Sequence, residues 1–211
     1  MAPINTKNVH RSNALMSHVY GEDFCYNEMW VTGPFDSEKG FARISKPVYD
    51  DKLETWVAPF FMAPINTKNV HRSNALMSHV YGEDFCYNDM WVTGPGDEGK
   101  AIADAIVSSN PLGGDDAPKP GEGPSRESRE NGNYDVLFCA DCDNGTIHAS
   151  VKGDMDPGYG STSKMITESA ICLVKECNDL EGGIYTPASS MGEKLINRLQ
   201  NNAGLTFTIE S

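Results

Sequence analysis

The sequence has no long apolar run. A membrane-spanning helix needs about 20 consecutive apolar residues, whereas the longest run here, within AICLVKE at residues 170–176, is short and ends in charged side chains. We therefore predict no membrane span. The first residues are polar and lack the apolar core of a signal peptide, so we expect a cytoplasmic protein, with an organelle as the alternative location.

Basic residues are scarce. Lys and Arg number 17 against 30 Asp and Glu, which gives a formal net charge of −13, and no segment gathers the basic side chains into a cluster. Sequence-independent binding to nucleic acid or to an anionic membrane depends on such clusters. We therefore predict no nucleic-acid partner.

Cysteine is less abundant than the count of six implies. Cys25 and Cys86 are equivalent positions of a segment that occurs twice in the chain. Without a secretory signal, buried thiols are favoured over a disulfide framework. Cys139 and Cys142 have the Cys-x-x-Cys spacing of redox and zinc motifs, but on an alternating strand they point to opposite faces. No metal site is predicted.

A long segment occurs twice. Residues 1–34 and 62–95 differ only where Glu28 of the first copy is matched by Asp89 of the second. Repeat folds let surface positions drift and need about three or more copies to share a core. Near-identity at every position therefore indicates a copied segment, and we expect the fold to hold one place for it.

The second copy is favoured for that place because the sequence on both sides of it resembles a known protein family. We predict a domain over 35–211 in which 62–95 is the native element, and a surplus copy at 1–34. The surplus copy would be displaced, add to a sheet edge, or exchange into a neighbouring chain as a domain-swapped dimer or other homo-oligomer.

Local patterns predict an α+β fold with a mixed, largely antiparallel sheet and helices packed on one face. The clearest hairpin lies at 133–154, with Asn144-Gly145 as its turn. A Pro/Gly-rich loop is expected at 111–133, and a capping box of Ser190 and Glu193 predicts the start of a late helix. The expected elements are strands at 41–50, 53–61, 84–93, 182–187 and 205–211, and helices at 67–78, 97–109, 160–176 and up to Gly204.

TGPGDEGK at 93–100 contains the Gly-x-Gly-x-x-Gly spacing of dinucleotide-binding loops, with glycines at 94, 96 and 99. Pro95 supplies no N–H, and Asp97 and Glu98 place negative charge where a pyrophosphate would bind. No acid that could bind a ribose ends a second strand about 20 residues further on. The pattern favours a tight turn, so no cofactor-binding residue is predicted in this chain.

GDMDPGYGSTSK at 153–164 predicts a glycine-rich turn from a strand into a helix. Backbone amides there, with nearby hydroxyls and an ammonium group, could hold an anion or a carbonyl oxygen. The alternative is a turn that needs glycine for its backbone alone. The residues assigned to substrate binding in this turn are Asp156, Gly158, Tyr159, Ser161, Thr162 and Lys164.

Arg72 and Asn74 complete the predicted substrate-binding set. They lie on the polar side of an expected helix, where an arginine can hold a carboxylate or phosphate with two hydrogen bonds. The alternative is an ordinary pairing of Arg72 with a nearby acid. No catalytic acid, base or nucleophile stands out in the sequence.

Five blocks, taken in order, resemble one family. The blocks are VYDDKLETWVAPFFMAPINTKNVHRSNAL, YGEDFCYNDM, PGEGPSRESRENG, VKGDMDPGYGSTSKMITESAICLV and GGIYTPASSMGEKLINRLQNNAGLTF. Over residues 41–211 the chain resembles the C-terminal half of saccharopine dehydrogenase-like oxidoreductases, in the branch of trans-acting enoyl reductases.

The resemblance implies a substrate-side domain that is catalytically incomplete alone. Family members begin with an NAD(P)-binding Rossmann domain, and residues 1–34 stand in its place here. NAD(P) is thus implied for the full-length family, and activity would need a separate chain with the nucleotide domain. The alternative is a non-catalytic binding or dimerisation module that contacts a protein partner or a lipid-like ligand.

Overall fold

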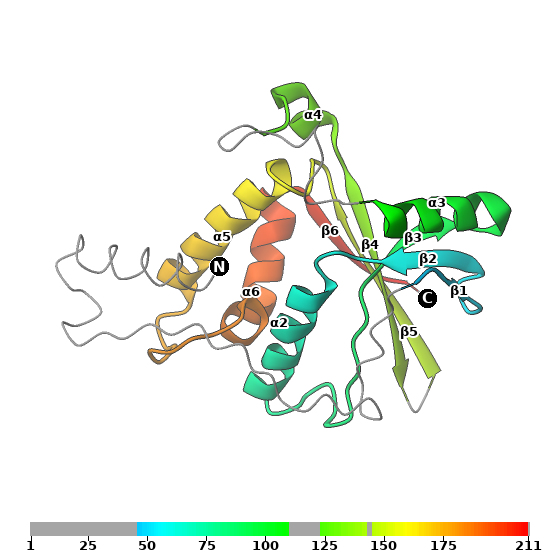
Figure 1. Ribbon diagram of the computed structural model, residues 1–211. Helices are drawn as coiled ribbons and strands as arrows, with labels where there is room; N and C mark the ends of the chain where they lie inside the picture. Colours follow the sequence, from blue (N-terminus) through cyan, green and yellow to red (C-terminus); the bar gives the residue numbers. More distant parts are fainter. Residues whose placement is uncertain (1–45, 110–122, 143–144, 211) are drawn as a thin grey trace, which may run out of the picture. The chain divides into compact units, whose positions relative to one another are not determined.

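A computed structural model describes residues 46–109, 123–142 and 145–210. All of these belong to one compact unit, 42–211 (Figure 1). The copy at 1–34 lies outside the described residues, so its displacement stays a prediction. Within the described ranges, no helix has the length and apolarity that crossing a membrane requires.

The first sheet contains three antiparallel strands in the order β1-β2-β3. They are β1 (Val48–Asp50), β2 (Thr55–Pro59) and β3 (Met90–Gly94). Helix α3 (Gly96–Ser108) follows β3 directly and packs against β2 and β3. Val57, Ala58 and Ala103 are fully or almost fully buried there, so a small apolar core joins α3 to this sheet.

The second sheet is also antiparallel, in the order β4-β5-β6. It comprises β4 (Tyr134–Cys142), β5 (Gly145–Gly153) and β6 (Leu205–Glu210). Helices α5 (Gly160–Glu176) and α6 (Pro187–Asn202) pack together, and α6 also contacts β6. Two buried clusters form the core of this part: Cys172, Cys177 and Met191 between α5 and α6, and Leu199, Ala203 and Leu205 where α6 meets the sheet.

Helix α2 (Ala63–Leu76) is tied to the start of α6. The Ser73 hydroxyl donates to Thr186 Oγ1 over 2.7 Å, and both residues are buried. The Arg72 guanidinium donates to the carbonyl oxygen of Ile184 over 2.8 Å. These polar contacts fix one end of α2 against the segment that leads into α6.

Helix α6 begins with a capping box formed by Thr186 and Ser189, and Pro187 occupies its first turn. Gly192 interrupts the helix with φ 48° and ψ −129°, a backbone conformation that costs side-chain-bearing residues more than glycine. Beyond this break, Arg198 forms ion pairs with Glu168 and Glu176 of α5 at 2.6 and 2.7 Å. The two halves of α6 thus have different polar partners.

The predicted α+β class is confirmed, with antiparallel pairing throughout the described strands. Two separate sheets stand where one was expected. The hairpin of 133–154 forms as β4 and β5, although residues 143–144 of its turn lie outside the described residues. The strands predicted to form one sheet are thus divided between two sheets.

Several element boundaries were predicted wrongly. Helix α6 begins at Pro187 because Thr186 and Ser189 cap it, ahead of the expected Ser190 and Glu193. The strand expected at 182–187 does not form, and only the end of the one expected at 84–93 pairs, as β3. Pro64 in the first turn lets α2 begin at Ala63, before the expected Thr67.

The stretch predicted as loop at 111–133 contains a helix in its described part. Helix α4 (Arg126–Asn131) begins after Ser125, whose hydroxyl accepts a hydrogen bond from the Ser128 N–H over 3.1 Å. Ser is a favoured residue at this capping position. The high proline and glycine content upstream obscured this short helix.

Candidate functional site

The predicted glycine-rich turn leads from β5 into α5, and Asp156 organises it. Its carboxylate accepts hydrogen bonds from the backbone N–H groups of Gly158, Tyr159 and Gly160, at 3.0, 2.8 and 2.8 Å. These bonds hold the pKa of Asp156 below its ordinary value, the Gly160 bond contributing most. The amides that could have held an anion are therefore bonded to a side chain of the chain itself.

Ser161 and Thr162 also have internal partners. Ser161 is fully buried, and its hydroxyl lies 2.8 Å from the Tyr134 hydroxyl. Thr162 Oγ1 donates to the carbonyl oxygen of Pro157 over 2.5 Å. A side chain at Gly153 would collide with the Tyr134 ring, so glycine is needed there. These contacts join the turn to the first residue of β4.

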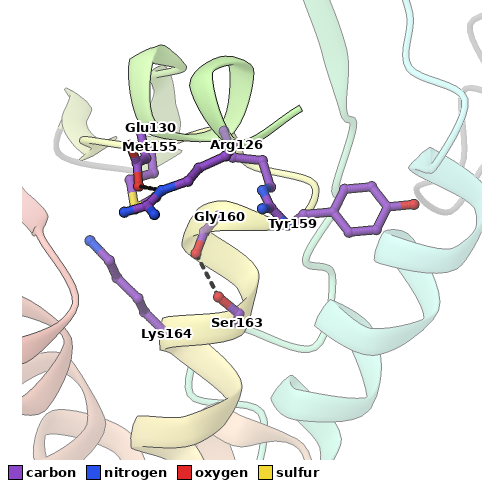
Figure 2. A pocket seen from close by; sticks show the side chains of 8 residues that line it. Arg126, Glu130, Met155, Tyr159, Gly160, Ser163 and Lys164 are labelled. Carbon is purple, nitrogen blue, oxygen red and sulfur yellow. Dashed lines mark hydrogen bonds and ion pairs between the residues drawn. The ribbon is translucent and has the colours of Figure 1, made fainter. Parts of the chain in front are cut away.

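A cavity of about 500 Å³ opens between α4 and the start of α5, and we call it the α4–α5 cavity (Figure 2). Three of its lining residues are cationic and one is an acid. The lining residues are Arg126, Arg129, Glu130, Met155, Tyr159, Gly160, Ser163 and Lys164.

Two exposed ion pairs border this cavity. Arg126 Nε lies 2.6 Å from Glu130 Oε1 within α4, and Lys164 Nζ lies 3.3 Å from Asp154 Oδ1. The Glu130 hydrogen bond and charge raise the pKa of Arg126 above its ordinary value. Figure 2 shows Lys164 extending from α5 on the same side as the Arg126–Glu130 pair, with the Tyr159 ring directed away from it.

A close backbone approach creates the walls of the cavity. The Asp156 N–H donates to the Arg129 carbonyl oxygen over 3.0 Å, which ties α4 to the turn before α5. A Cβ added at Gly160 would lie 3.1 Å from that same carbonyl oxygen. Gly160 therefore allows α4 to approach the first residue of α5 closely.

The structure brings together only part of the predicted site. Tyr159 and Lys164 line the α4–α5 cavity, Asp156 and Gly158 form the turn beside it, and Ser161 is buried behind them. Arg126 and Arg129 were not predicted as site residues, because they lie within residues 111–133, which were predicted to form a loop. The Ser-x-x-Ser spacing of 125–128, followed by charged helix formers, was the signal that could have found them.

Arg72 and Asn74 lie apart from the cavity lining and have local partners. Asn74 is buried, accepts from the Tyr81 N–H at 2.9 Å and donates to the Gly82 carbonyl oxygen at 2.8 Å. It thereby stabilises the turn after α2, where Ser78 and His79 both have φ 59°. Substrate contact by Arg72 and Asn74 stays a prediction.

The glycines of the Gly-x-Gly-x-x-Gly pattern serve the connection between β3 and α3. Gly94 and Gly96 have φ 108° and 67°, and a Cβ on Gly99 would collide with the Gly94 carbonyl oxygen. β3 pairs antiparallel with β2, unlike the parallel strands of a dinucleotide-binding unit. Among the described residues, no group of three or more His, Cys, Asp or Glu side chains is arranged to hold a metal ion.

Comparison with known proteins gives several relatives over 68% of the chain. A protein of Mycobacterium tuberculosis H37Rv, named provisionally as a trans-acting enoyl reductase, is 35% identical over 163 residues. The trans-acting enoyl reductase of Mycobacterium ulcerans is 31% identical over 163 residues, and that of Mycobacterium bovis BCG is 29% identical over 162. No family model and no solved structure matches the chain.

These relatives are longer than the region they share with this chain. The chain covers 39% of the length of each of the three. The shared region is similar at moderate identity to proteins with one common name. The chain thus spans less than half the length of these curated relatives, and what it shares with them is a similarity over about 163 residues to proteins named trans-acting enoyl reductase.

Proposed function

We propose that this chain is the substrate-side part of a saccharopine dehydrogenase-like, NAD(P)-dependent oxidoreductase of the trans-acting enoyl reductase type. Catalysis would require a nucleotide-binding domain from elsewhere, such as a separate chain. The similarity to trans-acting enoyl reductases over 68% of the chain carries this proposal. The antiparallel surroundings of the Gly94–Gly99 turn support the assignment of the nucleotide site to another domain.

Titration of the full chain with NADPH and with NADH, followed by nucleotide fluorescence, tests this proposal. We expect no tight saturable binding to this chain alone. Adding the part of the Mycobacterium ulcerans relative that this chain does not cover should restore saturable binding and support reduction of an enoyl substrate. Tight saturable binding by this chain alone would contradict the proposal.

A non-catalytic binding module is the second candidate, and the β4-β5-β6 sheet favours it. Val151 and Phe207 lie on one face of this sheet, and the helices leave other apolar side chains of the same face exposed. The exposed fractions of Phe138, Ile147 and Ile209 are 47, 54 and 83%. Contiguous exposed apolar surface commonly marks interaction sites. A stable complex without reductase activity in the reconstitution above would favour this candidate.

A further inference from the structure

We propose that the α4–α5 cavity binds a phosphate-bearing ligand, with Arg126, Arg129 and Lys164 as its anion-binding residues. The proposal deepens the proposed function, since this ligand would be the substrate or its carrier. It rests on that function only for the identity of the ligand, because the anion site itself can be measured without a nucleotide.

The charge of the lining contrasts with that of the chain. Three cations and one carboxylate line the cavity, although the formal net charge of the whole protein is −13. Arg129 forms no ion pair within the described ranges, yet its charge helps to lower the pKa of Asp156. The carboxylates of Glu130, Asp154 and Asp156 lie beside these cations, so an anion would bind by replacing them as partners of the cations.

The existing ion pairs leave these cations available. The side chains of Arg126 and Glu130 are 83 and 52% exposed, and those of Lys164 and Asp154 are 35 and 56% exposed. Exposed pairs of this kind contribute little to stability. A multiply charged ligand can therefore replace these carboxylates as a partner at little cost.

The three cations come from two helices that border one cavity. Arg126 and Arg129 are three residues apart on α4 and so lie on one side of it, while Lys164 comes from the first turns of α5. Guanidinium groups bind phosphate with paired hydrogen bonds, and an ammonium group adds a point charge. The bond from Asp156 N–H to the Arg129 carbonyl oxygen fixes the helices relative to each other.

The remaining walls suggest an apolar group next to the phosphate. Met155 also lines the cavity beside the cations, whereas the Tyr159 ring is directed away from the Arg126–Glu130 pair (Figure 2). A volume of about 500 Å³ exceeds what a bare phosphate fills. We therefore expect an organic phosphate to bind more tightly than inorganic phosphate.

Isothermal titration of the full chain with inorganic phosphate, phenyl phosphate and benzoate tests the proposal. Phenyl phosphate should bind most tightly, and its affinity should fall as salt is raised. Tighter binding of benzoate would replace phosphate by carboxylate as the ligand class and overturn the proposal. Absence of saturable phenyl phosphate binding would overturn it as well.

Variants locate the binding. Arg129→Gln and Lys164→Gln should each weaken phenyl phosphate binding about tenfold or more, as expected for loss of a charge-assisted contact. Lys175→Gln, which removes an exposed cation from the last turn of α5, should leave the affinity unchanged. Equal affinities in all three variants, or equal losses, would overturn the assignment. Should Arg129→Gln fail to fold, Arg126→Gln replaces it under the same criteria.

The two proposals can fail separately. A nucleotide site at Gly94–Gly99 would give NADPH binding that Arg129→Gln leaves unchanged, which contradicts the proposed function and leaves the phosphate site intact. Conversely, reconstituted reductase activity without phenyl phosphate binding would contradict only the phosphate site.

Discussion

Asp156 accepts three backbone hydrogen bonds at the start of α5, and its removal should therefore destabilise the protein. We expect Asp156→Ala to lower the free energy of unfolding by roughly 1–2 kcal/mol, because three backbone N–H groups lose a charged hydrogen-bond acceptor. Asp135→Ala, which removes only an exposed ion pair with Lys152, should cost less than about 0.5 kcal/mol. Urea unfolding at pH 7 measures both.

The Asp156 contribution should depend on pH in one direction. Its pKa is lowered in the folded state from the ordinary 3.8, so the stabilisation is present above this value and is lost as the pH falls through the lowered pKa. The difference between wild type and Asp156→Ala should therefore shrink below about pH 4. A difference that stays constant down to pH 2 would contradict this assignment.

Tyr87 gives a second pH-dependent prediction, at the alkaline end. Burial, followed by the charge and hydrogen bond of Asp89, raises its pKa from 10.0 to about 12. A raised pKa stabilises the folded state below the unfolded value and loses this effect as the pH rises through the folded value. The stability advantage of wild type over Tyr87→Phe should therefore be full at pH 9 and decline from pH 10 towards 12.

Urea midpoints at pH 9 and at pH 11.5 measure this decline for both proteins. Equal advantages at the two pH values would show that Tyr87 does not titrate as assigned. Asp89 also accepts a hydrogen bond from the Asn66 side chain over 2.6 Å. The one difference between the two copies of the duplicated segment, Glu28 against Asp89, thus falls on a residue with two polar contacts.

At the scale of elements, Thr186 both caps α6 and joins it to α2. Thr186→Ala should lower the free energy of unfolding by roughly 1–2 kcal/mol, because the capping box is lost and the Ser73 hydroxyl loses a partner. Thr186→Ser keeps a hydroxyl in place and should recover most of this loss. Thermal unfolding of the two variants provides the comparison.

A double-mutant cycle separates the two roles of Thr186. If the Ser73–Thr186 bond is significant, Ser73→Ala and Thr186→Ala should be non-additive by roughly 0.5–1 kcal/mol. Strict additivity would leave capping as the sole role of Thr186.

Local sequence patterns predicted the helices and strands that are defined by residues close together in the sequence. The alternation through β4 and β5 and the apolar spacing of α5 sufficed, because a hairpin and an amphipathic helix are encoded within about 20 residues. The capping box at Ser190 and Glu193 was misleading, since Thr186 and Ser189 offer a capping box of their own, with Pro187 in the first turn. A short capping pattern does not show which of two possible first residues a helix adopts.

The candidate site was less predictable, because tertiary contacts assemble it. Tyr159 and Lys164 were found from the glycine-rich turn, which is a local feature. Arg126 and Arg129 lie about 30 residues earlier and reach the cavity through the bond between Asp156 and the Arg129 carbonyl oxygen. No spacing rule links two segments that meet only in the folded chain.

At the scale of the whole molecule, the compact unit at 42–211 should fold without the first copy. A protein that starts at Asp36 should show the far-ultraviolet circular dichroism expected for the elements described above and a melting temperature close to that of the full chain. Analytical ultracentrifugation of both proteins would reveal a domain-swapped dimer as a species that only the full chain forms. If the shortened protein fails to fold while the full chain stays soluble, residues 1–34 are part of the native fold.

The break at Gly192 divides α6 into two segments with different contacts. The segment before it bonds to α2 through Thr186 and packs on Cys172 of α5 through Met191, while the segment after it pairs with α5 through Arg198. The positive φ at Gly192 thus falls where these contacts divide. A residue with a side chain at this position would strain the backbone at the point where one helix contacts both α2 and α5.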